Sequence, residues 1–123
     1  MTQARNLMEQ GVFCYATFFA EQAAQKALKA VLLAQGARLA PLHSVSALLE
    51  QAAQQEPRLA SLVNAGKRLD RHYLTARYPD ALPEPLIPAD AYLREDAEEA
   101  VAAASAIVEA ARAAVGEISR APN

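Results

Sequence analysis

Three short clusters of polar residues contain the candidate catalytic and ligand-binding side chains. The first is the run Lys67-Arg68-Leu69-Asp70-Arg71-His72-Tyr73. Arg68 and His72 are four residues apart, so on a helix they share one face. A cationic face with a histidine that titrates near neutrality could bind a phosphate and transfer a proton. The commoner alternative for a charged helix face is a solvated stripe, here partly neutralised by Asp70.

The second cluster, Arg77-Tyr78-Pro79-Asp80, stands where a helix should end. Pro79 disfavours helical geometry at Tyr78, which gives the segment a defined shape. Arg77 and Asp80 could pair with each other or hold an anion. Alternatively, Arg77 caps the last helical carbonyls and Asp80 only makes a turn.

The third cluster comprises Gln22, Lys26 and Lys29, three or four residues apart, with His43 further along the chain. These residues could join the pocket of Arg68 and His72 if the two helices pack together. The alternative is that the lysines lie along the edge of a helix interface, with their stems buried and their charges in water. His43 could simply fix the loop before Ser44.

These clusters are predicted to lie on helices or in the links that follow them. The apolar spacing predicts helix over 2–35 with a weak point at Gly11, a short helix from Val45 to about Gln54 capped by Ser44, and helices over 57–75 and 90–118. Four prolines make 77–88 irregular. We therefore expect an all-α fold, an up-and-down antiparallel bundle of four main helices plus a short helix, in one domain spanning 1–123.

Apolar stripes define the expected core faces. One stripe in the first long helix includes Ala16, Ala20, Ala23, Ala27 and Ala30, with Glu21, Gln22 and Gln25 on the polar remainder. A near-heptad, Ala-rich stripe runs along the last helix from Leu93 to Val115. This last stripe offers more apolar surface than one small bundle needs, which predicts a homodimer.

Composition excludes several classes of function. The net charge of −2 is not that of a nonspecific nucleic-acid-binding domain, and the apolar run 11–20 is too short to span a bilayer. The single cysteine and the absence of a signal-peptide pattern favour a cytoplasmic protein. With two histidines and no phosphate loop or nucleophile elbow, we expect neither a metal site nor a cofactor.

Several motifs in order resemble the HEPN family, the nucleotide-binding domains of prokaryotes and higher eukaryotes. The similar segments cover about residues 4–115, and they are 20–30, Leu42-His43-Ser44 with Leu48-Leu49, Leu69-Asp70 with Tyr73, 75–80, and Tyr92 with Asp96-Ala97. The resemblance implies a helical bundle, commonly a homodimer, often encoded beside a small nucleotidyltransferase in toxin–antitoxin-like pairs. It also implies a nucleotide- or phosphate-contacting surface at His43, Tyr73, Arg77, Tyr78 and Asp80.

Some HEPN proteins resemble metal-independent ribonucleases, in which a histidine follows an arginine by four to six intervening residues. Only three residues separate Arg68 from His72, and Lys67 lacks the planar fork of an arginine. The sequence therefore favours a binding module for nucleotide, RNA or partner over an enzyme. The alternatives are an endoribonuclease that uses Arg68 and His72, and a purely structural dimer or adaptor.

Overall fold

The computed structural model describes residues 3–4, 13–38, 44–77 and 94–120, with only the helical backbone described at 13–14 and 72–77. In order, the elements are α2 (Phe13–Ala34), α3 (Val45–Ala53), the 3-10 helix η1 (Pro57–Leu62), α4 (Val63–Arg77) and α6 (Arg94–Arg120). All of these elements are helical, as the apolar spacing predicted. The expected weak point at Gly11, the irregular residues after 77 and the cap at Asp90 lie outside the described residues.

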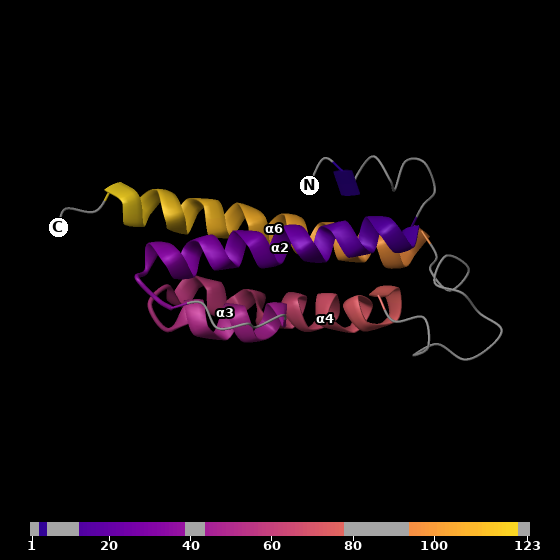
Figure 1. The fold of residues 1–123 in the computed structure, drawn as a ribbon, viewed down its shortest axis with the longest axis horizontal. Helices are drawn as coiled ribbons and strands as arrows, with labels where there is room; N and C mark the ends of the chain where they lie inside the picture. The colour runs from indigo at the N-terminus through magenta and orange to yellow at the C-terminus, as the bar shows by residue number, and fades with distance from the viewer. Residues whose placement is uncertain (1–2, 5–12, 39–43, 78–93, 121–123) are drawn as a thin grey trace.

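Two helix pairs make up the described part of the bundle (Figure 1). α2 and α6 lie side by side and share the largest contact in the described chain, while α3 packs against α4. The two pairs also touch each other, through α2 with α3 and α4 and through α4 with α6. The core between them is built almost entirely from Ala, Leu, Val and Ile.

The helix directions differ from a strict up-and-down order. α2, α3 and α6 run one way and α4 runs the other (Figure 1). The shared direction of α2 and α3 agrees with a hydrogen bond of 3.1 Å that Gln35, at the end of α2, donates to the Ala52 carbonyl near the end of α3. The chain between the C-terminal cap of α2 and Ser44 is long enough for such an arrangement, because seven residues can span up to about 23 Å, more than the ~14 Å length of the nine-residue α3.

Local signals set most of the helix ends. Ser44 caps α3, accepting a hydrogen bond of 3.1 Å from the Ala47 amide. Pro57 begins a 3-10 turn rather than the predicted α-helix, which starts only at Val63 and runs on to Arg77. Gly36, with a φ of +80°, ends α2, and the Ala37 amide donates back to the Leu32 carbonyl.

Burial matches the prediction for α6 better than for α2. The α6 stripe is buried at Ala97, Ala100, Ala104, Ile107 and Ala111, inside the molecule's own core. These residues therefore pack within the molecule, and the homodimer expected from this stripe stays a prediction.

On α2 the buried face is rotated from the expected one. Ala16 and Ala20 are buried, but Ala30 is exposed and Glu21 and Gln25 are buried. Alanine has little apolar area, so a stripe of alanines marks a helix face only weakly.

Candidate functional site

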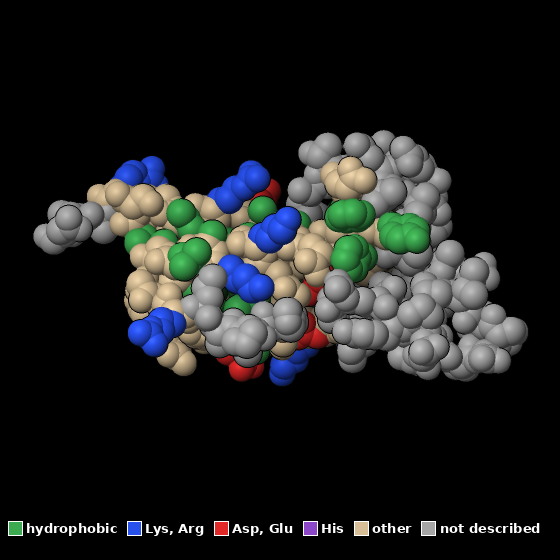
Figure 2. Space-filling view, viewed as in Figure 1, with side chains coloured by type: hydrophobic (Ala, Val, Ile, Leu, Met, Phe, Trp, Pro, Cys, Tyr) green, Lys and Arg blue, Asp and Glu red, His purple; other side chains and the backbone are tan. Residues whose placement is uncertain are grey.

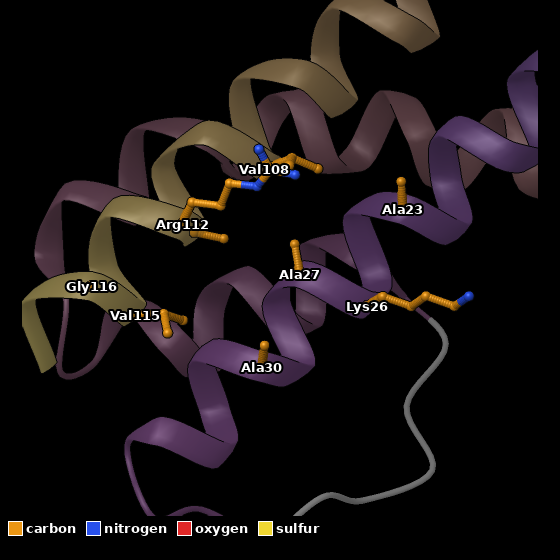
Figure 3. Close-up of a pocket in the computed structure, with 9 residues that line it drawn as sticks. Ala23, Lys26, Ala27, Ala30, Val108, Arg112, Val115 and Gly116 are labelled. Carbon is orange, nitrogen blue, oxygen red and sulfur yellow. The ribbon is translucent and has the colours of Figure 1, made fainter. Parts of the chain in front are cut away.

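A groove of about 550 Å³ runs between α2 and α6. Figure 3 shows its walls, with Ala23 nearer to Val108 at one end and Ala30 nearer to Val115 at the other. Small side chains leave the groove open, because alanine and Gly116 extend little beyond the backbone. The volume lies in the range of small-molecule sites, which are mostly apolar with a few polar groups.

Two cations, Lys26 and Arg112, supply the charge of this groove, and no carboxylate is among its described lining residues. Arg112 extends from α6 toward Val108, whereas Lys26 leaves α2 on the outer side with its ammonium pointing away from the alanines (Figure 3). Both side chains are exposed, and neither makes an ion pair or hydrogen bond within the described residues. An apolar floor beside two uncompensated cations suits an anion with a flat apolar part.

The predicted pair of Arg68 and His72 lies on α4, and no α4 residue is among the described lining of the groove. Arg68 is exposed, and its Nε lies 3.7 Å from Glu99 Oε1 on α6. A carboxylate at that distance competes with a phosphate for the guanidinium. The helix places His72 one turn after Arg68, but the histidine side chain lies outside the described part.

The other predicted site residues are only partly visible. Tyr73 and Arg77 belong to the backbone of α4, and their side chains are outside the description. His43, Tyr78 and Asp80 lie outside the described residues altogether. Lys26 is thus the one predicted ligand-binding residue whose side chain the structure places, and Arg112 is the groove residue that the sequence did not single out.

Asp70, expected to neutralise a basic stripe, instead holds the start of α3. Its carboxylate accepts hydrogen bonds from the Ser44 hydroxyl at 2.8 Å, the Val45 amide at 2.7 Å, and the Ser46 amide and hydroxyl at 3.2 and 2.7 Å. An anion at a helix N-terminus satisfies free amides and complements the helix dipole. The Leu69-Asp70 motif therefore has a structural role, because Asp70 sets where α3 begins.

Helical periodicity did not predict a buried polar stripe on α2. Thr17, Glu21 and Gln25 are four residues apart and almost fully buried. The Glu21 carboxylate accepts hydrogen bonds from Gln25 and, at 2.9 Å, from Gln22. A polar residue on a helix is normally assigned to solvent, so only the packing of α2 reveals this stripe. Buried polar groups of this kind must be satisfied by partners, which fixes their geometry.

Metal and membrane chemistry receive no support from the described ranges. No group of three His, Cys, Asp or Glu side chains gathers there at metal-binding distance. The helices in these ranges also lack the combination of length and apolar character needed to cross a bilayer.

Comparison with known proteins assigns the chain to a family. The sequence profile of the HEPN domain matches residues 1–114. The fold is similar to the crystal structure of TT1696 from Thermus thermophilus, with a TM-score of 0.83 and 36% sequence identity over 92% of this chain and 87% of that one. A search of curated proteins finds no match. Profile, fold and the ordered motifs agree, and the chain belongs to the HEPN domain family.

Proposed function

We propose that this HEPN domain is a non-catalytic binding module for a phosphate-bearing ligand, a nucleotide or an RNA end. The observation that supports it is the α2/α6 groove, with an apolar floor and two cations, Lys26 and Arg112, that have no carboxylate partner among the described residues. A base can lie against the alanines, while the guanidinium of Arg112 donates two parallel hydrogen bonds to the phosphate. Lys26 has a flexible stem and can swing toward the same phosphate.

The first test is calorimetry with ATP, GTP and a short 5′-phosphorylated RNA. Wild type should bind at least one of them, and Arg112→Ala should weaken binding by about 10- to 100-fold, since hydrogen bonds to charged groups contribute about 1.5–3 kcal/mol. Arg38→Ala is the matched control, because Arg38 is exposed and does not line the groove. Absence of binding to all three ligands, with and without a partner protein, would reject the proposal.

A small nucleotidyltransferase is the partner that the family membership supports, in a toxin–antitoxin-like pair in the cytoplasm. We expect a nucleotidyltransferase reading frame beside this one and a complex that co-purifies after co-expression. Co-expression that yields only the separate proteins would remove this part of the proposal and leave the ligand site to be judged alone.

The ribonuclease alternative has a direct test on the Arg68 and His72 pair. Labelled mixed-sequence RNA, incubated in EDTA with the purified protein, should stay intact, because the residue spacing departs from the family's ribonuclease motif and Arg68 lies beside Glu99. Cleavage by wild type but not by a folded His72→Ala variant would overturn the non-catalytic assignment.

A further inference from the structure

A third cation, Arg120, lies at one end of the α2/α6 groove. Arg120 is not among the lining residues, but Gly116 is, and a Cβ placed on Gly116 would lie 3.4 Å from a terminal nitrogen of the Arg120 guanidinium. The guanidinium therefore lies over Gly116, one turn back along α6 from its own backbone. Arg120 is exposed, and it makes no ion pair or hydrogen bond within the described residues. Its charge is thus available to a ligand that extends past Gly116.

Helix geometry places Arg112, Gly116 and Arg120 along one side of α6. They follow one another at intervals of four residues, which is about one turn each. Both arginine side chains lean toward the start of the helix, since Arg112 extends toward Val108 (Figure 3) and Arg120 lies over Gly116. Their guanidinium groups are therefore about eight residues of helical rise apart, or about 12 Å along the axis. Gly116 has no side chain, so the helix surface between the two guanidinium groups is bare.

The nearby carboxylates leave both arginines unneutralised. Glu117 follows Gly116 directly, but both of its oxygens accept hydrogen bonds from Arg58 on η1. Glu109 is exposed and makes no ion pair with Arg112 within the described part of the chain. Figure 2 shows blue side chains spread over α2 and α6 on one face, whereas most of the red side chains lie near its lower edge. This end of the groove therefore favours a ligand with more than one negative charge.

We propose that Arg112 and Arg120 hold the two ends of a phosphate chain, so that the ligand of the groove is a nucleoside triphosphate. This inference rests on the proposed function, in which a base lies against the alanines of α2. Two guanidinium groups about 12 Å apart, each donating a hydrogen bond of about 3 Å, leave about 6 Å between the two acceptor oxygens. A single phosphate group is too small to span that distance, so a monophosphate reaches one arginine only. Linked phosphates can cross the bare surface at Gly116 and reach both.

Calorimetry with AMP, ADP and ATP in EDTA tests the dependence on phosphate-chain length without Mg²⁺ between the phosphates and the arginines. Wild type should bind ATP about 10- to 100-fold more tightly than AMP, because hydrogen bonds between charged groups are the stronger ones. Arg120→Gln, which keeps the helix propensity, should lower ATP affinity to near that of AMP and leave AMP affinity unchanged. Arg112→Gln should weaken both nucleotides. The matched control is Arg38→Gln, at an exposed arginine outside the groove, and it should keep the full preference for ATP.

The outcomes separate the role of Arg120 from the proposed function. Equal affinities of wild type for AMP and ATP, or a preference for ATP that survives in Arg120→Gln, would overturn the role of Arg120 and leave the nucleotide groove standing. If Arg120 only complements the dipole at the end of α6, Arg120→Gln will lower the Tm and keep the preference for ATP. An equal loss of that preference in Arg38→Gln would show a general charge effect and also contradict the proposal.

RNA ends carry the same phosphate chemistry and are tested in parallel. A short RNA with a 5′-triphosphate is compared with the same RNA carrying a 5′-monophosphate. A gain in affinity confined to this pair, with AMP and ATP bound equally, would overturn the assignment to a free nucleotide. Absence of binding by folded wild type to all of these ligands would reject the proposed function together with this inference.

Discussion

The α3/α4 pair and the α2/α6 pair are both helix contacts in one bundle, but they are built differently. α3 and α4 meet closely at Gly66 and are joined by the Asp70 hydrogen bonds to residues 44–46. α2 and α6 meet along small side chains and leave a groove with cations at its edge. The α3/α4 contact is therefore closely packed, its polar groups are hydrogen-bonded, and it stabilises the fold. The α2/α6 contact leaves a groove with unneutralised cations, which a ligand can use.

The largest loss of stability is expected from Asp70→Ala. It removes four hydrogen bonds to the start of α3 and leaves two backbone amides without their acceptor. We expect the free energy of unfolding to fall by about 2–4 kcal/mol, since hydrogen bonds to charged groups and helix caps each contribute about 1–3 kcal/mol. Chemical denaturation measures it, with Glu50→Ala on the exposed face of α3 as the control. An equal, small effect of both variants would show that Asp70 does not hold α3.

A pair of glycines compares the two contacts directly. A Cβ at Gly66 would lie 2.7 Å from Leu49 Cδ1 and 3.1 Å from the Ser46 backbone, whereas a Cβ at Gly116 would meet only the flexible end of Arg120, at 3.4 Å. Gly66→Ala should cost about 1–3 kcal/mol by overpacking. Gly116→Ala should gain about 0.5–1 kcal/mol, because alanine is the better helix former. Thermal unfolding of both variants gives the signs, and a stabilising Gly66→Ala would mean that α3 and α4 can separate at little cost.

Filling the groove should separate ligand binding from stability. In the Ala30→Leu variant the longer side chain would project from α2 into the groove, because Ala30 is exposed and lines it. We expect the free energy of unfolding to change by less than about 0.5 kcal/mol, while nucleotide affinity falls by steric exclusion. Calorimetry and denaturation on the same sample test both. Undiminished affinity in a folded variant would place the ligand outside the groove.

The smallest effect is expected at the exposed ion pair between η1 and α6. Arg58 donates to both oxygens of Glu117, at 3.0 and 2.6 Å, and these hydrogen bonds raise the pKa of the Arg58 guanidinium. Because the pKa of Arg58 is higher in the folded than in the unfolded chain, the ion pair stabilises the fold at every pH below the unfolded-state pKa. This stabilisation is lost only in strong alkali. Arg58→Gln should therefore cause a small loss that does not change between pH 5 and 9 and that disappears in 1 M salt. A large loss that persists in 1 M salt would show that the pair anchors η1 to α6.

The helices, their caps and the family resemblance follow from the amino-acid sequence alone. Ser44 before an apolar run, Gly36 after one and the spacing from Ala97 to Ala111 are local signals that need no partner. They were enough to predict an all-helical bundle, whereas the HEPN resemblance came from the ordered sequence motifs. The Ala-rich stripe of α6 was also located correctly from Ala97 to Ala111, and it packs inside the molecule.

Which helix faces meet becomes known only from the packed fold. In the fold, Asp70 holds the start of α3 instead of lying on a charged surface, and Glu21 and Gln25 are buried. Arg112 and Lys26, which are 86 residues apart in the sequence, line the same groove. Helical periodicity gives the angle between residues on one helix but not the rotation of that helix against its neighbours. In a chain so rich in alanine, that rotation is set by close packing and by the pairing of buried polar groups, and both depend on residues distant in sequence.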